Sequence, residues 1–504
     1  MSEQNATVIT DNGNTAIAGI DLGSNSFHLV VAHANGEDIN VVDRIKETVR
    51  LGAGLDDKRN LSDEAMQRGL DCLTLFAQRV REISPGNLRA VGTNALRQAR
   101  NSEKFVREGA KILGHPIEVI SGREEARLIY AGVARTVAAD DRRRLVMDIG
   151  GGSTEFIIGQ GRYPLLLESL YMGCVSWTAQ FFPKGRITRK LFDAAVVAAR
   201  QELESIETEY RNMGWEISMG SSGTSLAIAD LISQRMNLSY INKSALGDLR
   251  DQFIQLGKSD LLTEMGVAQD RAQVLPGGLA ILQAAFESLN LDKMSVSHGA
   301  LREGLLNDIV ERINRKDIRD DAVAELMGRY AVDREQVSRV EHTALQLFDD
   351  VRDRWELNDN ARKMLGWATG LHEIGRAVSH NQYHKHGEYL ARHHDLRGFS
   401  REQQSLLAAL VRGHRRKFPL GVVNALPEDQ TTLAIHLCIL LRLAVLLHRS
   451  RTPDPLGDFE LWVKESRLKL AFANNWLDDH ALTCADLAQE ADYLKKAGIE
   501  LQIK

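Results

Sequence analysis

Short apolar runs and longer amphipathic stretches alternate along the first quarter of the chain. Apolar runs at Ala16–Asp21 and Phe27–Ala32 have the length of strands and flank a small polar turn. Leu61–Arg81 has helical spacing, and Ser62 is placed to cap its N-terminus. The same reasoning predicts three further elements in chain order: a strand at Leu88–Val91, a helix over Asn94–Leu113 and a strand at Ile117–Ile120. This order of strands and helices predicts an α/β domain.

The opening pattern returns further along the chain. The stretch LVMDIGGGSTEFIIG, Leu145–Gly159, can be laid beside IAGIDLGSNSFHLVV. Asp148 then matches Asp21 and Gly150 matches Gly23, with one residue inserted in the second turn. An apolar strand precedes and follows each turn, so the repeat predicts two similar lobes that each open with an Asp-x-Gly hairpin.

Helical patterns dominate from about Asp317 to Arg449, and the segment that begins at Arg451 (RTPDPLG) has linker composition. A hairpin, a helix and a last strand are then predicted at Leu461–Val463 with Leu468–Phe472, Ala485–Lys496 and Ile499–Ile503. The predicted organisation is a disordered tail (1–15), lobe I (16–128), lobe II (129–311), an all-helical domain (312–449) and a small α+β domain (450–504).

Composition excludes several classes of protein. Among 504 residues, 43% are hydrophobic and 26% charged, and the net charge is −5, so no overall basic field exists to gather nucleic acid. Four widely spaced cysteines without a CxxC pair suit a reducing cytoplasm. The most apolar stretch, Leu433–Leu447, is interrupted by His436 and Arg442 and is shorter than a membrane span. We therefore expect a cytoplasmic protein with no transmembrane segment and no nucleic-acid partner.

The glycine-rich turns suggest phosphate chemistry. A turn of Gly, Ser and Asn presents backbone N–H groups and hydroxyls that can wrap a phosphate, and an adjacent aspartate suits Mg²⁺. One such turn alone is better explained by an ordinary Asx-type hairpin. Two matched turns, with further glycine turns at Ser218–Ser225 and Val296–Gly304, favour the phosphate interpretation.

Three charged residues near these turns have two interpretations each. Ser121 and Glu124 have capping-box spacing, which leaves Glu125 either as a first-turn acid favoured by the helix dipole or as a general base for water. Arg97 follows a strand and would suit a phosphate, or it is a solvated surface residue. Glu155 follows the second turn and would join Asp148 at a metal, or it lies at the surface.

Taken together, these stretches resemble the exopolyphosphatase / guanosine pentaphosphate phosphohydrolase family, within the fold group of actin-like ATPases, Hsp70 and sugar kinases. The matching pieces, in the family's order from Ile20 to Gly304, are IDLGSNSFHLVV, GTNALRQA, ISGREEARLIY, VMDIGGGSTEFIIG, MGCVSW, GSSGT and GALREG. The helical region and the small tail domain resemble the long, four-domain members. The resemblance therefore implies two actin-like (ribonuclease-H-like) lobes, a helical HD-like domain and a small α+β domain.

The resemblance also implies roles for single residues. Glu125 takes the place of the catalytic glutamate, Arg97 matches a phosphate-contacting arginine, and Asp148 and Glu155 match the acids associated with Mg²⁺, to which we add Asp21. Dependence on a monovalent cation such as K⁺ stays open. The predicted phosphate-binding residues are Gly23, Ser24, Asn25, Ser26, Gly150, Gly151, Gly152, Ser153, Thr154, Gly220, Ser221, Ser222, Gly223 and Thr224.

Two departures from the family pattern limit what is carried over. His298 stands before GALREG where a close relative would carry aspartate, and the HD-like pair reads His372-Glu373 rather than His-Asp. We assign catalysis to neither. The basic cluster Arg412–Lys417 would suit a long polyanion, or it is a solvated face.

The sequence thus predicts a Mg²⁺-dependent exopolyphosphatase that releases orthophosphate processively from inorganic polyphosphate, as a homodimer. Peripheral membrane association stays open. The alternative is a guanosine pentaphosphate 5′-phosphohydrolase using the same site. A kinase related to sugar kinases would need a base for a sugar hydroxyl, whereas Glu125 in SGREEA favours water. A non-catalytic sensor would keep the loops without needing Glu125.

Overall fold

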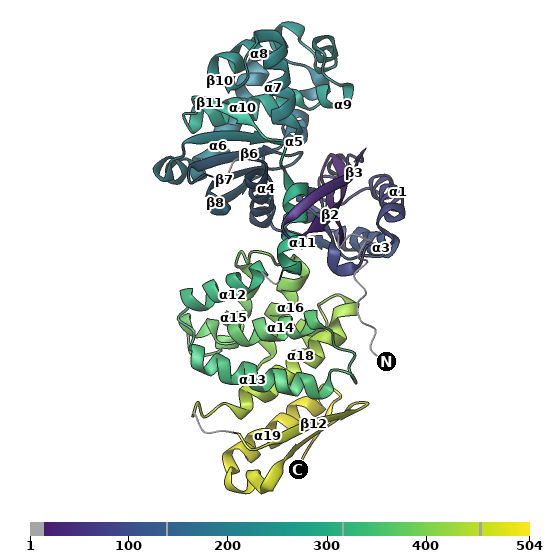
Figure 1. Cartoon of the computed structure of the whole chain (residues 1–504), viewed down its shortest axis with the longest axis vertical. Coiled ribbons are helices and arrows are strands. Elements are labelled where there is room, and N and C mark those ends of the chain that lie inside the picture. Colours follow the sequence, from purple (N-terminus) through teal and green to yellow (C-terminus); the bar gives the residue numbers. More distant parts are fainter. Residues whose placement is uncertain (1–14, 138–139, 315–316, 453–455) are drawn as a thin grey trace. The chain divides into compact units, whose positions relative to one another are not determined.

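The computed structural model describes residues 15–137, 140–314, 317–452 and 456–504. The predicted tail therefore lies outside the described residues except for Thr15, and the predicted linker lies partly outside them. The chain divides into two compact units, the first ending at Lys316 and the second running from Asp317 to Lys504 (Figure 1).

The first unit contains two sheets with the same strand order. The five-stranded sheet has the order β3-β2-β1-β4-β5, and the six-stranded sheet has β8-β7-β6-β9-β11-β10. The strands of the first sheet are β1 (Thr15–Leu22), β2 (Ser26–Asn35), β3 (Asp38–Thr48), β4 (Leu88–Gly92) and β5 (Ile117–Val119). Those of the second are β6 (Arg143–Ile149), β7 (Thr154–Gln160), β8 (Tyr163–Leu170), β9 (Ile217–Ser221), β10 (Ile241–Asn242) and β11 (Lys293–Val296). In each sheet an antiparallel three-strand meander continues into parallel strands, as the internal repeat predicts.

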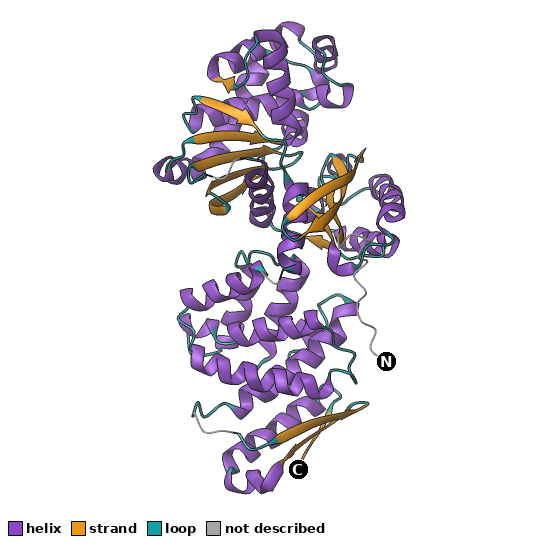
Figure 2. Ribbon diagram, in the orientation of Figure 1, coloured by secondary structure: helices purple, strands orange, loops and turns teal. Residues whose placement is uncertain are grey.

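Helices complete the two lobes (Figure 2). They are α1 (Asp63–Val80), α2 (Asn94–Gln98), α3 (Ser102–Leu113), α4 (Gly122–Thr136), α5 (Cys174–Phe181), α6 (Arg189–Met213), α7 (Ser222–Met236), α8 (Lys243–Leu256), α9 (Gln269–Ala272), α10 (Leu275–Ser288) and α11 (Leu301–Ile313). Ser62 caps α1 as predicted, since its hydroxyl accepts a hydrogen bond from the Ala65 N–H at 3.2 Å.

One predicted helix, Asn94–Leu113, is wrong, because the structure divides it into α2 and α3. The side chain of Asn101 accepts a hydrogen bond from the Leu61 N–H at 2.8 Å and donates one to the Leu61 carbonyl at 3.0 Å. The Arg100 N–H donates to the carbonyl of Arg59. These bonds draw the backbone out of the helical path at the break.

The chain crosses between the lobes twice. Helix α4 packs on β7 and β8 of the second sheet, whereas α11 packs on β1 and β2 of the first, and the two helices also pack on each other. Their approach is so close that a Cβ on Gly304 would lie 1.8 Å from the Leu128 carbonyl oxygen, so only glycine fits there. The predicted boundaries at 128/129 and 311/312 fall inside these two helices.

The second unit is a helical domain followed by a small sheet with the order β12-β13-β14 (Figure 2). Its helices are α12 (Ile318–Arg329), α13 (Arg334–Val351), α14 (Asp359–Leu371), α15 (Tyr383–His393), α16 (Arg401–Gly413), α17 (Leu420–Val423), α18 (Glu428–Leu447) and α19 (Ala481–Lys495). Its strands are β12 (Phe459–Lys464), β13 (Arg467–Phe472) and β14 (Glu500–Ile503). The inner faces of the sheet and of α19 join the apolar core of the helices, so the two predicted domains share one core.

Among the described residues, α18 is the one helix long and apolar enough to cross a membrane by length and composition, with a mean hydropathy of 1.8 in its most apolar window. Its residues from Leu437 to Ala444 are all buried in the core of the second unit. The helix also carries Arg442, which is ion-paired with Glu490 on α19. It is therefore packed as a core helix, as predicted for Leu433–Leu447.

Candidate active site

The two Asp-x-Gly turns occupy equivalent places in the two sheets. Asp21 is the next-to-last residue of β1 and lies opposite His28 of β2, and Asp148 is the next-to-last residue of β6 and lies opposite Glu155 of β7. The first turn spans residues 23–25 and the second 150–153, which accounts for the inserted residue seen in the sequence. Both aspartates are therefore delivered to a loop edge by the same hairpin geometry.

The structure brings the two turns into contact with each other. A Cβ on Gly151 would lie 3.1 Å from the Cβ of Ser24 and 3.5 Å from the backbone nitrogen of Asn25. A Cβ on Gly152 would lie 2.6 Å from the side-chain oxygen of Asn94. Glycine at these positions thus lets one loop from each lobe meet at one place, where both could face a single ligand.

The third loop, Gly220–Thr224, joins the second turn at the same sheet edge. Asp148 is paired in register with Ser221 of β9, so the loop starts beside the aspartate. Ser222 begins α7 with a positive φ of 78°, an uncommon backbone conformation for a residue other than glycine. Its hydroxyl is buried and has no hydrogen-bond partner. A residue with a positive φ and an unpartnered hydroxyl at a helix N-terminus suits an anionic ligand.

Glu125 and Arg97, 28 residues apart in the sequence, form an ion pair. The Arg97 Nη1 lies 3.0 Å from Glu125 Oε2 and also donates to the Ile120 carbonyl at 3.0 Å. Both side chains are at most one-tenth exposed. Burial raises the pKa of the Glu125 carboxyl above its ordinary value, and the charge of Arg97 opposes that rise. Arg97 therefore contacts Glu125, a pairing that its sequence position did not indicate.

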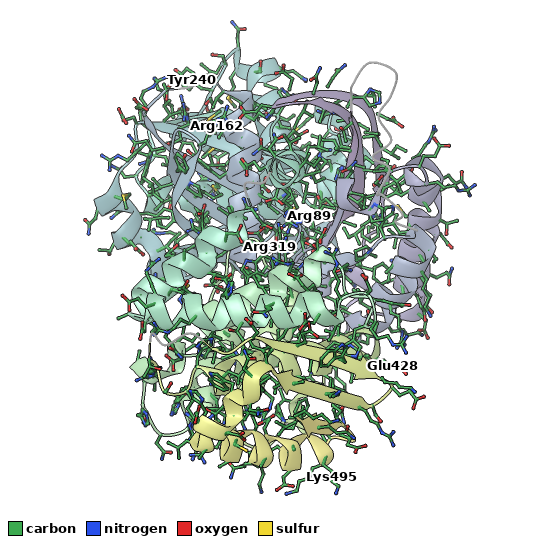
Figure 3. All side chains as sticks on the ribbon, turned by 60° about the horizontal axis from the view of Figure 1, so that its bottom comes forward. Arg89, Arg162, Tyr240, Arg319, Glu428 and Lys495 are labelled. Atoms are coloured by element: carbon green, nitrogen blue, oxygen red, sulfur yellow. The ribbon has the colours of Figure 1, made fainter. Side chains whose placement is uncertain are left out.

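Glu124, next to Glu125 on α4, takes a different role. Ser121 caps α4 by accepting a hydrogen bond from the Glu124 N–H at 3.1 Å. The Glu124 carboxylate meets Arg127 at 2.8 Å and Arg89 at 3.5 Å, and both arginines bind Asp308 of α11. Arg89, labelled in Figure 3, is 3% exposed, so these ion pairs lie inside the unit. They connect β4, α4 and α11 and so fix the position of α4, the helix that carries Glu125.

Three further carboxyl groups share the electrostatic environment of Glu125. Burial, with the nearby charge of Glu125, raises the pKa of Asp21 to about 8, and burial raises that of Asp148 to about 6. Burial and the charges of Glu125 and Asp148 raise the pKa of Glu155 well above its ordinary value. Ser169 donates to one oxygen of Glu155 at 2.8 Å, while the other oxygen, like Oδ1 of Asp21, is buried without a hydrogen-bond partner.

These acids fit a Mg²⁺ ion. Two buried carboxylate oxygens without partners, in a cluster of like charge, are the ligands that a hard cation takes. Within the described residues no three His, Cys, Asp or Glu side chains converge closely enough to hold a metal by themselves. Mg²⁺ is commonly held by one or two carboxylates together with water and phosphate oxygens.

Sequence reasoning missed two arginines at this site. Arg271 of α9 lies against the third loop, since a Cβ on Gly223 would be 2.4 Å from its guanidinium. Arg302 of α11 contacts His28 at 3.1 Å, and its charge acts on both Asp21 and Asp148. Arg302 belongs to the quoted GALREG stretch, so that motif could have identified it. No pattern marks Arg271. His298, the departure noted above, is exposed.

A pocket of about 390 Å³ opens beside the first loop. Ser24 and Asn25 form one end of it, and Arg50 and Lys184, both exposed, lie along it. The rest of its lining is mixed: Val175, Phe182 and Val274 are among its apolar residues, and Asp260 and Asp270 add two carboxylates. The pocket offers two cations, two acids and an apolar surface next to the predicted phosphate loops.

Comparison with known proteins agrees with this arrangement. The model of the Ppx/GppA phosphatase family matches residues 29–313, and that of domain III of Ppx/GppA phosphatases matches residues 318–491. A guanosine-5'-triphosphate,3'-diphosphate pyrophosphatase of Pseudoalteromonas translucida is 39% identical over 485 residues, which are 96% of this chain and 97% of that protein. One of Aeromonas hydrophila is 39% identical over 95% of this chain and 97% of its own length.

Among solved structures, an exopolyphosphatase from Cytophaga hutchinsonii is 26% identical, with a TM-score of 0.55, and covers 59% of this chain and 98% of its own. The Aquifex aeolicus Ppx/GppA family member is 24% identical with a TM-score of 0.52, over 60% of this chain and 99% of its own, and supports the fold. Fold and matches together define an actin-like hydrolase of phosphoanhydrides. The chain belongs to the Ppx/GppA phosphatase family, as its sequence motifs predict.

Proposed function

We propose that the protein hydrolyses guanosine 5′-triphosphate 3′-diphosphate, releasing the terminal 5′-phosphate as orthophosphate. The observation that supports this substrate is the full-length similarity, at 39% identity, to relatives named for it. The sequence analysis favoured exopolyphosphatase and kept this activity as its alternative. The relatives favour the alternative.

The pocket beside the first loop supports a nucleotide substrate. Its volume of about 390 Å³ is in the range of small-molecule sites, and its apolar wall suits a purine and ribose. Arg50 and Lys184, which share the lining with Asp260 and Asp270, supply two positive charges for a second phosphate group, such as the 3′-diphosphate. The triphosphate would then enter between the loops at Ser24 and Gly151.

In the proposed reaction, Glu125 accepts a proton from the water that attacks the terminal phosphorus. Arg97 holds the Glu125 carboxylate at 3.0 Å and so fixes the direction in which its oxygens point. The three loops donate backbone N–H groups and hydroxyls to the phosphoryl oxygens, and Arg271 adds positive charge beside the third loop. The bond to the bridging oxygen breaks, and guanosine 5′-diphosphate 3′-diphosphate leaves with the electron pair.

Asp21, Asp148 and Glu155 would hold Mg²⁺ in this site. When bound, the ion supplies positive charge that offsets the charge spreading over the phosphoryl oxygens. A bound cation would also offset the cost of burying these acids, whose pKa values are raised first by burial and further by the charge of Glu125. We further infer a cytoplasmic enzyme that acts as a homodimer.

Exopolyphosphatase activity is the second candidate. The likeness to the Cytophaga hutchinsonii exopolyphosphatase, at 26% identity, favours it. The basic cluster Arg412–Lys417 would suit a long anionic chain. Both activities would use the same phosphate loops and the same general base.

The deciding experiment measures Mg²⁺-dependent orthophosphate release from guanosine 5′-triphosphate 3′-diphosphate, long polyphosphate, GTP and ATP. We expect the highest kcat/KM for the pentaphosphate. A clear preference for long polyphosphate would move the assignment to the second candidate. Release from none of the four would remove the enzymatic proposal.

A double variant tests the role of the pocket. Arg50→Ala with Lys184→Ala should raise KM for the pentaphosphate about five- to tenfold, the size expected from losing ~1–1.4 kcal/mol of binding, with little effect on KM for GTP. Arg107→Ala with Lys190→Ala, two exposed residues outside the pocket, is the matched control. Equal increases for both nucleotides would show that the pocket does not recognise the 3′-diphosphate.

A further inference from the structure

The two Asp-x-Gly hairpins place different residues at equivalent positions. In lobe II, Asp148 lies opposite Glu155 of β7, so this hairpin brings two acids to the site. In lobe I, Asp21 lies opposite His28 of β2, so the position equivalent to Glu155 holds an imidazole. Residues directly opposite on neighbouring strands have their side chains close together on one face of the sheet. The lobe I hairpin therefore offers a ring nitrogen where the lobe II hairpin offers a second carboxylate.

His28 binds an arginine from α11. Arg302 Nη1 lies 3.1 Å from His28 Nδ1. A guanidinium can only donate, so Nδ1 accepts this hydrogen bond and the imidazole is neutral. Burial, with the charges of Arg302, Lys46 and Arg271, lowers the pKa of His28 to about 3, so the ring is also neutral at pH 7. His28 is therefore a fixed acceptor for Arg302 rather than a proton donor.

The start of α11, which carries Arg302, is fixed to both parts of the site. The hydroxyl of Ser221, in the third loop, donates to the Gly299 carbonyl at 3.0 Å, just before the helix begins. On the other side, a Cβ on Gly19 of β1 would lie 3.6 Å from the Arg302 carbonyl oxygen. Arg302 thus comes from a backbone segment held against the third loop and against the strand that ends beside the first turn.

Arg302 has no carboxylate partner within 4 Å among the residues that the structure describes. The neighbouring acid, Glu303, pairs with Arg44 at 3.0 Å instead. The hydrogen bond to His28 uses one N–H group of the guanidinium. Because a guanidinium has five N–H donors in a planar fork, others remain for a ligand.

The positive charge of Arg302 stands where the protein alone disfavours it. Arg302 is the second residue of α11, and the positive end of a helix dipole disfavours a cation there. The charges of both Arg302 and Arg271 act on His28, so a second cation is near. Asp21 and Asp148 are close enough for Arg302 to lower their pKa values against the larger effect of burial, and both acids fit Mg²⁺. An anion that binds beside that metal, as a phosphoryl group does, would offset the charge of Arg302.

We propose that Arg302 is a further catalytic residue, which donates hydrogen bonds to oxygens of the transferred phosphoryl group, and that His28 is the residue that positions it. The inference rests on the phosphoanhydride hydrolysis proposed for this site. Negative charge spreads over the phosphoryl oxygens in the transition state, and a positioned arginine stabilises it. The two hairpins of the repeat then have different roles: the lobe II acids serve Mg²⁺, and His28 of lobe I fixes a guanidinium.

The first experiment compares kcat and KM of the wild type, Arg302→Ala and Arg302→Lys with guanosine 5′-triphosphate 3′-diphosphate and with long polyphosphate. Arg302→Ala should lower kcat about 100- to 1,000-fold, the range for one lost donor to a transition-state oxygen, with a much smaller change in KM. Arg302→Lys should recover part of the loss, because an ammonium keeps the charge without the fork. Arg81→Ala, which removes an exposed arginine of the same lobe, is the matched control. A kcat for Arg302→Ala equal to that of the control would overturn the proposal.

Rescue by free guanidinium distinguishes a catalytic role from a structural one. Millimolar guanidine hydrochloride should raise kcat of Arg302→Ala about tenfold and leave the wild type unchanged; the rescue is partial because the free ion is not held in place. Arg302→Ala should also be as stable as the wild type in urea unfolding, because the arginine opposes the helix dipole. Absence of rescue together with a loss of stability would show a structural role and refute the proposal.

A double-mutant cycle tests the role of His28. His28→Leu should lower kcat about tenfold, since Arg302 loses its acceptor, whereas His28→Asn, whose amide oxygen can accept in place of Nδ1, should stay near the wild type. In the Arg302→Ala enzyme, His28→Leu should cause no further loss, and a second tenfold fall there would refute the positioning role. Failure of the proposed substrate is a separate result: a wild type that prefers polyphosphate changes the substrate assignment, and the same variants are then compared with polyphosphate.

Discussion

Replacing Glu125 by glutamine separates its chemical role from its structural one. Glutamine keeps the length of the side chain, and its amide oxygen can still accept the hydrogen bond that Arg97 Nη1 donates at 3.0 Å. The variant loses the ability to accept a proton from water. We therefore expect kcat to fall by about two to four orders of magnitude, the usual range for a general base. Each factor of ten corresponds to about 1.36 kcal/mol in the barrier.

The electrostatics of the site predict the effect on binding. The charge of Glu125 contributes to the raised pKa values of Asp21, Asp148 and Glu155. Removing that charge favours the ionised form of the three acids and reduces repulsion of the substrate. KM should therefore stay the same or fall while kcat collapses.

The neighbouring residue provides the control for this prediction. Glu124→Gln alters the buried ion pairs with Arg89 and Arg127, and it should destabilise the first unit by up to about 3–5 kcal/mol, as when one partner of a buried pair is lost. Its kcat at a temperature where it is folded should stay within a few-fold of the wild type. The assay is orthophosphate release with guanosine 5′-triphosphate 3′-diphosphate, beside thermal unfolding. A Glu125→Gln enzyme that retains more than a tenth of wild-type kcat would refute the general-base role.

Two further predictions concern the second unit. Arg442→Met should lower the free energy of unfolding by about 3–5 kcal/mol, measured with urea, because it leaves Glu490 buried without its partner. Adding Glu490→Leu should restore much of that loss. A double variant no more stable than the single one would contradict this prediction. Burial lowers the pKa of His448 to about 4, so the unfolded chain takes up its proton first as the pH falls below 6.5. The free energy of unfolding should therefore decline from pH 6.5 to about 4. In His448→Gln, urea unfolding at pH 7 and pH 4.5 should show a smaller decline. An unchanged decline would refute the attribution of this pH dependence to His448.

Local signals in the sequence were sufficient for the elements that carry the phosphate loops. The hairpins at Asp21 and Asp148 follow from apolar runs around a polar turn, and the repeat follows from their likeness. The cap at Ser62 is also a local signal, because it depends on residues within three positions. Prediction from the sequence failed where contacts between distant residues determine the backbone conformation. The helix predicted over Asn94–Leu113 is broken by hydrogen bonds between Asn101 and Leu61.

The same distinction holds for the candidate site. The acids and glycines stand in motifs that can be read directly from the sequence. The pairing of Arg97 with Glu125 instead depends on the parallel pairing of β4 with β5, the strands that precede α2 and α4. Arg271 lies in a four-residue helix with no recognisable pattern, and only its contact with Gly223 reveals it.

Glu124 and Glu125 show how far adjacent residues of one type can diverge. Consecutive residues on an α-helix point about 100° apart, so the two carboxylates leave α4 in different directions. Glu124 points into a buried set of arginines, whose charges lower its pKa against the effect of burial. Glu125 has one arginine and a group of like charges, and burial raises its pKa. The sequence shows two glutamates in the first turn of a helix. Their different neighbours keep Glu124 ionised in buried ion pairs and make Glu125 suited to exchange a proton.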